Sequence, residues 1–121
     1  MSKILFVEDE PSLQKAIREV LTQEGYKVLG AADGEEGLKK AKEEKPNLIL
    51  LDLILPKKDG FEVLKELKAD EKLKDIPVIV LTNLEGVGDV EKALELGATT
   101  YLVKANYKLE DVVNKIKELL D

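Results

Sequence analysis

The sequence predicts a doubly wound α/β domain, in which helices cover both faces of a parallel sheet. Short runs rich in leucine and β-branched residues alternate with longer segments of helical periodicity, a pattern typical of strands joined by crossover helices. Residues 48–51 and 78–81 are apolar at every position, as expected of strands covered on both faces. A chain of 121 residues, of which 44% are hydrophobic, has the size of one domain with one core, and we expect a single domain over residues 1–121.

Five strands are predicted from the apolar runs. They occupy residues 4–7, 27–30, 48–51, 78–81 and 100–103. Consecutive predicted strands begin about 20 to 30 residues apart. This spacing is long enough for a right-handed crossover through a helix. Turn-forming residues precede four of the five strands, namely Gly25, Pro46, Pro77 and Gly97.

Five helices are predicted between and after these strands, and each shows apolar residues at helical spacing. Asp33 has the position of an N-cap for the second helix. The predicted stripes are Leu13, Ala16, Ile17, Val20 and Leu21; Leu38 and Ala41; Phe61, Leu64 and Leu67; Val87, Val90 and Leu94; and Leu109, Val112, Val113, Ile116 and Leu120.

The composition excludes several classes of function. With 19 Lys and Arg against 25 Asp and Glu, the net charge of -6 argues against direct nucleic-acid binding. The absence of cysteine and histidine excludes disulfides, thiol chemistry and the commonest general base. No apolar run approaches a membrane span, and acids follow the N-terminal "MSKILFV" directly, so we expect a cytoplasmic protein without a membrane partner.

Polar residues follow four of the predicted strands. Glu8 and Asp9 follow the first, Asp52 the third, Thr82 the fourth and Lys104 the fifth. In open parallel sheets, ligands bind outside the carboxyl ends of the strands, so these side chains mark the candidate site. Asp52 lies within "NLILLDLILP", the most apolar run of the chain, where an unpaired carboxylate is costly.

Each of these residues also has a simpler interpretation. Asp9 has a suitable position to cap the helix entered through Pro11, Thr82 to form a turn, and Lys104 to be a solvated surface lysine. Asp52 precedes a loop rather than a helix that it could cap. The joint arrangement at one sheet edge favours a functional site over four separate structural roles.

These residues resemble the receiver domain of bacterial two-component response regulators. The resemblance covers the whole chain, from "ILFVEDE" through "LLDLILPKKDGFEVL" and "VIVLTN" to "YLVKA". It implies a flavodoxin-like, chemotaxis-regulator-like fold with five parallel strands in the order 2-1-3-4-5 and five helices.

The resemblance also implies a chemistry. Asp52 would be the phosphoacceptor, and Glu8, Asp9, Asp52 and the backbone carbonyl of Ile54 would hold Mg²⁺. Three clustered carboxylates repel one another by roughly 3 to 4 kcal/mol per pair at an effective dielectric near 20, and a hard divalent cation removes that penalty. Acyl phosphate formation on a carboxylate needs mainly positioning and charge stabilisation.

Three further residues receive roles from the resemblance. Thr82 would donate its hydroxyl to a phosphoryl oxygen, Lys104 would pair with the phosphoryl group or with Asp52, and Tyr101 would be the switch aromatic. Movement of Thr82 and Tyr101 would remodel the face formed by the fourth helix, the fifth strand and the fifth helix. On the residues alone, Tyr101 is an ordinary half-buried strand aromatic.

The expected function is phosphorylation-dependent signalling rather than enzymatic turnover. Because the chain has no histidine, the phosphoryl donor must be another molecule, expected to be a sensor histidine kinase or a phosphotransfer protein. The chain is expected to act alone or as part of a larger regulator, on an unknown protein target, as a monomer or phosphorylation-dependent dimer.

Two other functional classes stay open at this point. One is a non-switching pseudo-receiver or a designed scaffold that keeps the fold, and the intact site residues argue against it. The other is an enzyme, either a flavin carrier of similar topology or a haloacid-dehalogenase-type phosphatase. The phosphatase needs a second aspartate where Ile54 stands, and the chain has no glycine-rich or P-loop phosphate cradle.

The sequence departs from the family pattern near the site. Ala105 replaces the usual proline, which favours a trans peptide after Lys104 because a non-proline cis bond costs about 3 to 4 kcal/mol. Asn83 replaces a small residue and is expected to screen the site. Ile54 and Leu84 cannot orient an attacking water, which predicts a long-lived acyl phosphate. Without metal, Asp52→Ala and Asp9→Asn are both expected to raise the melting temperature.

Overall fold

The computed structural model describes residues 2–120, and within them every predicted strand and helix is present. The strands are β1 (Lys3–Val7), β2 (Lys27–Ala31), β3 (Leu48–Leu51), β4 (Val78–Thr82) and β5 (Thr100–Val103). The α-helices are α1 (Pro11–Gln23), α2 (Gly34–Glu44), α3 (Gly60–Ala69), α4 (Val87–Glu95) and α5 (Leu109–Leu120). A short 3₁₀ helix over Lys104–Asn106, which the sequence pattern did not predict, connects β5 to α5.

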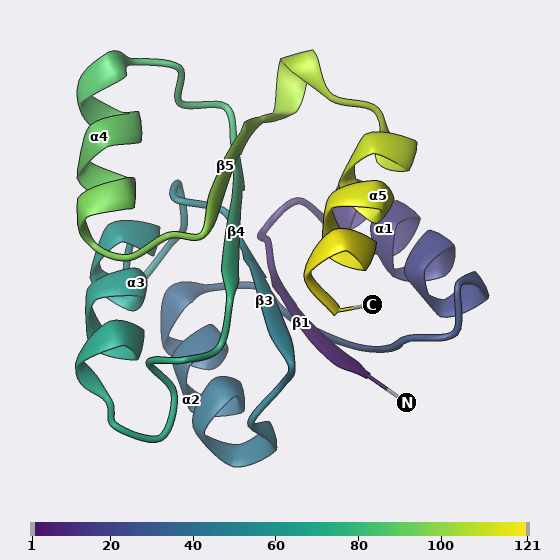
Figure 1. Cartoon of the computed structure of the whole chain (residues 1–121), viewed down its shortest axis with the longest axis horizontal. Coiled ribbons are helices and arrows are strands. Elements are labelled where there is room, and N and C mark those ends of the chain that lie inside the picture. Colours follow the sequence, from purple (N-terminus) through teal and green to yellow (C-terminus); the bar gives the residue numbers. More distant parts are fainter. Residues whose placement is uncertain (1, 121) are drawn as a thin grey trace.

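All five strands are parallel and lie in the order β2-β1-β3-β4-β5, which confirms the predicted topology. Helices α1 and α5 cover one face of the sheet, and α2, α3 and α4 cover the other (Figure 1). Between β1 and β3 the chain changes the direction in which it adds strands. The carboxyl ends of these two strands therefore mark the place where doubly wound folds typically bind ligands.

The core has two halves, one on each face of the sheet. On the α2–α4 side, Leu5 and Val7 of β1 pack with side chains from the three helices, whereas Ile4 and Phe6 pack with α1 and α5. This alternation follows from the period of two residues in a strand. All the residues of β3 and β4 are buried, as their continuous apolar runs predicted.

The helix boundaries follow local signals. Asp33 caps α2 as predicted, since its Oδ1 accepts a hydrogen bond from Glu36 N at 2.8 Å. Gly25 and Gly97 have positive φ values of 97° and 107°, which glycine adopts without steric cost. Lys45 ends α2 in the left-handed region at φ 44°, a conformation that its side chain disfavours. No helix within residues 2–120 has the length and hydrophobicity that crossing a bilayer requires.

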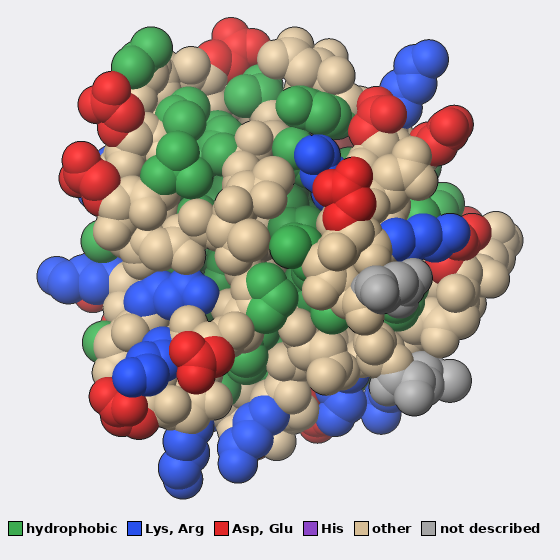
Figure 2. Space-filling model, viewed as in Figure 1, with side chains coloured by type: hydrophobic (Ala, Val, Ile, Leu, Met, Phe, Trp, Pro, Cys, Tyr) green, Lys and Arg blue, Asp and Glu red, His purple; other side chains and the backbone are tan. Residues whose placement is uncertain are grey.

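The predicted apolar stripe of α4 is wrong. Val87 is 74% exposed and Leu94 is 48% exposed, while Ala93 is the buried residue of this helix and Val90 is half-buried. The side of α4 that carries Ala93 packs against the core, and Val87 and Leu94 lie on its exposed side. Figure 2 shows hydrophobic side chains at the surface over α4 and β5.

Candidate functional site

Strand register brings Glu8 and Asp52 together. Val7 at the end of β1 pairs with Leu51 at the end of β3, and the two acids are the next residues along each strand. Asp52 N donates a hydrogen bond to Val7 O at 3.1 Å, which extends the ladder by one step. Both acids are buried, with exposures of 1% and 3%. The sequence prediction that they share one sheet edge is confirmed.

Lys104 provides the cation that these two carboxylates share. Its Nζ lies 2.8 Å from Glu8 Oε1 and 3.0 Å from Asp52 Oδ2, and only 15% of its side chain is exposed. Burial alone would lower the pKa of Lys104, but the hydrogen-bonding carboxylates of Glu8 and Asp52 outweigh this effect and raise that pKa. The alternative interpretation of Lys104 as a solvated surface lysine is therefore wrong.

Backbone N–H groups hold the remaining oxygens of both acids. Glu8 Oε2 accepts a hydrogen bond from Glu10 N at 3.0 Å, and Asp52 Oδ1 accepts one from Ile54 N at 3.2 Å. Glu8 Oε1 is buried and, apart from its ion pair with Lys104, accepts no well-aligned hydrogen bond from the residues that the structure describes. Burial raises the pKa of Glu8, against the opposing effects of the Lys104 and Glu10 hydrogen bonds.

Asp9 completes a cluster of three carboxylates. One oxygen from each of Glu8, Asp9 and Asp52 lies within 4.8 Å of the others. Asp9 is exposed and does not cap α1, because the N-cap of that helix is Glu10 and no side chain caps it. One lysine balances only one of the three negative charges. The exposed acid, the buried under-bonded oxygen of Glu8 and the all-oxygen donor set together suit a hard divalent cation.

Thr82 is the last residue of β4, and Tyr101 lies in the neighbouring strand β5. Thr82 is fully buried, and its Oγ1 accepts a long hydrogen bond of 3.5 Å from Leu84 N. Tyr101 packs against the α2–α4 half of the core, and its hydroxyl donates to Leu84 O at 2.8 Å. Burial raises the pKa of Tyr101, with smaller contributions from the charges of Asp89 and Asp52. Both residues thus contact the loop that leads into α4.

The family departures lie next to the site residues in the chain. The Lys104–Ala105 peptide is trans, since residues 2–120 contain no cis peptide bond, and this confirms the expectation from Ala105. Asn83 and Ile54 are exposed, and Leu84 is half-buried. No acid, amide or hydroxyl therefore stands at positions 54 and 84.

Sequence reasoning missed the role of Gly60. Its N–H donates to Leu53 O at 2.9 Å, and a Cβ atom there would lie 2.3 Å from Asp52 O. Only glycine allows α3 to begin this close to the backbone of Asp52. The signal was present in "KKDGFEV", where a glycine follows Asp59, the N-cap of α3.

Comparison with known families decides which protein family this site belongs to. The family model for the response regulator receiver domain matches residues 4–117, which include the acids, Thr82, Tyr101 and Lys104. The chain belongs to the receiver-domain family. The receiver domain accordingly has the flavodoxin-like fold of two-component response regulators, and no family of enzymes is indicated.

Individual relatives agree with this family. The receiver domain is 48% identical over 102 residues to a probable transcriptional regulator, ycf27, of Porphyridium aerugineum, covering 84% of this chain and 41% of that protein. It is 30% identical to the chemotaxis protein CheY4 of Vibrio cholerae, with a TM-score of 0.91 and 98% of each chain covered. This receiver domain spans less than half the length of the curated relatives, which are transcriptional regulators.

One solved structure bears on the metal. The receiver domain of the sensor histidine kinase PA1611 from Pseudomonas aeruginosa PAO1 is described with a magnesium ion coordinated in its active-site cleft. It is 33% identical to this chain, with a TM-score of 0.88, and the match covers 98% of this chain and 96% of that one.

Proposed function

We propose that Asp52 of this receiver domain accepts a phosphoryl group from a phosphohistidine of a sensor histidine kinase or phosphotransfer protein. One carboxylate oxygen forms a bond to phosphorus while the bond from phosphorus to the donor's ring nitrogen breaks. The observation that carries this proposal is the shared contact of Lys104 with Glu8 and Asp52, next to a third carboxylate within 4.8 Å. Three carboxylates with a single lysine keep an excess of negative charge, which is unfavourable unless a further cation binds there.

The proposed cofactor is Mg²⁺, held by the carboxylates of Glu8, Asp9 and Asp52 and by the backbone carbonyl of Ile54. When bound, the ion neutralises charge on the phosphoryl oxygens. Lys104 pairs with the phosphoryl group as a compact point charge on a flexible stem. The hydrogen bond from Ile54 N to Asp52 Oδ1 supports this arrangement, because it fixes the turn that carries both residues.

The proposed output is a change in the surface formed by α4, β5 and α5. Thr82 would follow the phosphoryl group and Tyr101 would follow Thr82, through the loop residue Leu84 that both contact. The exposed side chains of Val87 and Leu94 give that surface apolar contacts for a protein partner. We further propose that the receiver domain comprises residues 1–121 and acts in the cytoplasm. It is proposed to bind no nucleic acid directly and to be a monomer or a phosphorylation-dependent dimer.

Mass spectrometry after incubation with acetyl phosphate and Mg²⁺ tests the proposal. The wild-type chain should gain the mass of one phosphoryl group, and the gain should disappear in Asp52→Asn or when a chelator removes the metal. Asp59→Asn is a matched control, because this aspartate caps α3 outside the acid cluster. Phosphoryl incorporation that persists in Asp52→Asn would disprove the assignment of the phosphoacceptor.

A further inference from the structure

Gln14 connects the acid-bearing end of β1 to its neighbours. Its side-chain amide donates two hydrogen bonds, to Glu8 O at 2.9 Å and to Ala31 O at 3.1 Å. Glu8 N donates to the same Ala31 O at 2.9 Å. The first turns of α1, the end of β1 and the end of edge strand β2 therefore meet at one side-chain amide.

The end of the sheet explains why an amide is needed at this position. Strand β2 ends at Ala31, so it offers no further backbone N–H group to the carbonyl of Glu8. A glutamine side chain carries two N–H donors on one nitrogen, which match the two carbonyls. Replacement by an apolar residue leaves both carbonyls without this donor, and replacement by glutamate puts an acceptor against them.

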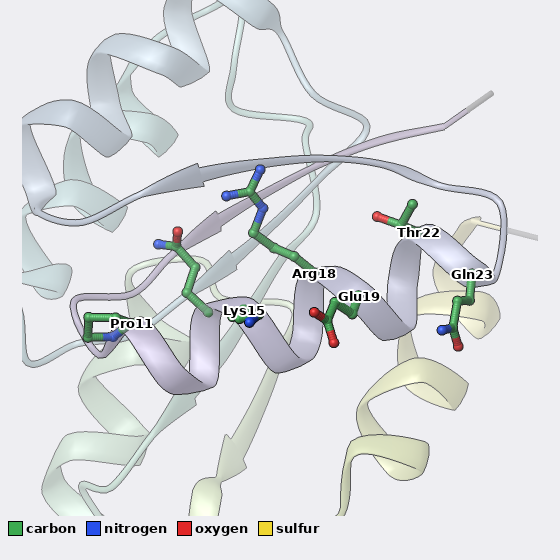
Figure 3. A pocket seen from close by; sticks show the side chains of 7 residues that line it. Pro11, Lys15, Arg18, Glu19, Thr22 and Gln23 are labelled. Atoms are coloured by element: carbon green, nitrogen blue, oxygen red, sulfur yellow. The ribbon is translucent and has the colours of Figure 1, made fainter.

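Gly30 leaves room for this amide. A Cβ atom on Gly30 would lie 2.5 Å from Gln14 Oε1 and 2.9 Å from its Cδ. The φ value of Gly30 lies outside the left-handed region, so alanine fits the backbone and its methyl group has to displace the amide. Gln14 lines an open hollow of about 550 Å³ along α1, and Arg18, another residue of this hollow, extends beside β2 (Figure 3).

The backbone of residues 8–10 determines the position of the Asp9 carboxylate. No hydrogen bond or ion pair to the Asp9 carboxylate occurs within the described part of the chain, so no side chain holds it. Its position depends on the peptide that follows Glu8, whose carbonyl Gln14 holds. Glu8 depends on the same peptide, because its Oε2 accepts from Glu10 N.

We infer that Gln14 is a positioning residue for the metal site, holding the Glu8 carbonyl so that the Glu8 and Asp9 carboxylates converge on Asp52. This inference rests on the proposed Mg²⁺ site and adds to it a residue outside the acid cluster. Groups that orient metal ligands typically affect metal affinity by about 10- to 100-fold. Gln14 acts through two neutral hydrogen bonds, and the expected loss of Mg²⁺ affinity is roughly tenfold.

Isothermal titration with Mg²⁺ alone tests the inference, on the full chain at neutral pH and well below the melting temperature. Gln14→Met and Gly30→Ala should each raise the Kd for Mg²⁺ roughly tenfold. The double variant should bind Mg²⁺ no more weakly than either single variant, because both changes remove the same amide contact. Gln23→Met, on the last turn of α1, is the matched control. Arg18→Met removes the other side chain beside Gly30 and shows how much of any change in the Kd for Mg²⁺ comes from that side chain.

The outcomes separate positioning from simple stabilisation. If Gln14→Met and Gly30→Ala lower the melting temperature but bind Mg²⁺ as the wild type does, the inference is wrong and the metal site stands. If the wild-type chain takes up no Mg²⁺, the metal site and the inference both fail. If Gln14→Met does not fold, Gly30→Ala alone decides, since it leaves the glutamine in the chain. Additive losses in the double variant would also contradict a shared contact.

Discussion

Lys104 Nζ lies 3.0 Å from Asp52 Oδ2, although the two residues are 52 positions apart in the chain. The same ammonium group lies 2.8 Å from Glu8 Oε1. Without a metal ion, Lys104 is therefore the cation that offsets the electrostatic cost of burying these two carboxylates. Mg²⁺ would use oxygens of the same carboxylates, so the lysine and the metal ion compete for them.

Removing Lys104 should have opposite effects on stability and metal binding. In the absence of metal, Lys104→Met is expected to lower the free energy of unfolding by about 2 to 3 kcal/mol, because it leaves two buried carboxylates unpaired. The Kd for Mg²⁺ should fall roughly tenfold, since no ammonium group competes for the ligands. Chemical denaturation and Mg²⁺ titration measure the two effects, with the exposed Lys108→Met as control. An unchanged or weaker Mg²⁺ affinity would contradict the competition.

The structure separates the two stability predictions that the sequence treated alike. Asp9 has no side-chain partner in residues 2–120, so Asp9→Asn removes only repulsion and should raise the free energy of unfolding by about 0.5 kcal/mol without metal. Asp52→Ala removes repulsion but also an ion pair, so its effect should be smaller than about 1 kcal/mol in either direction. Thermal unfolding in a chelator measures both. A lower melting temperature for Asp9→Asn would disprove clustered repulsion.

Glu8 should give stability a characteristic pH dependence. Its raised pKa means that, between 4.5 and the raised value, the folded state binds more protons than the unfolded state at this position. The Glu8 contribution therefore destabilises the fold as pH rises through that window, and Glu8→Gln should remove this slope. Urea unfolding in a chelator across the window measures it, with the exposed Glu19→Gln as control. An identical pH slope in wild type and Glu8→Gln would contradict the assignment.

The acyl phosphate on Asp52 should be long-lived. Ile54 follows Asp52 by two residues and is 52% exposed, and neither it nor Leu84 has a side-chain polar group that orients an attacking water. Ile54→Asn should shorten the half-life of the phosphorylated form several-fold, and Ile54→Val is the control of similar character. Loss of radiolabelled phosphate over time gives both half-lives. A wild-type half-life shorter than that of Ile54→Asn would refute this prediction.

Lys45 offers a stabilising substitution away from the site. It ends α2 at φ 44°, where a residue with a Cβ costs roughly 1 kcal/mol more than glycine. Lys45→Gly should raise the melting temperature by about 4 °C for a domain of this size. The same change at Lys42, inside the helix, should lower it, since glycine is about 1 kcal/mol less favourable there. Calorimetry of both variants checks the contrast in sign.

Several features of the site could be predicted because they depend on local pattern. The apolar runs located the strands, and polar residues after four of the five runs marked the edge where Glu8, Asp52 and Lys104 meet. The α4 stripe failed for a different reason. Helical periodicity shows which residues share a side of the helix, but packing against the sheet selects Ala93 rather than Val87 for the core.

The sequence by itself determined the type and order of the elements, because the periods of strands and helices are written in adjacent residues. It also determined which residue types stand at the strand ends. Only the tertiary structure decided which of these groups touch. Register places Glu8 beside Asp52, the turn after β5 brings Lys104 to both, and Gln14 reaches two carbonyls from α1. Such contacts depend on distances between segments far apart in the chain, which no local pattern contains.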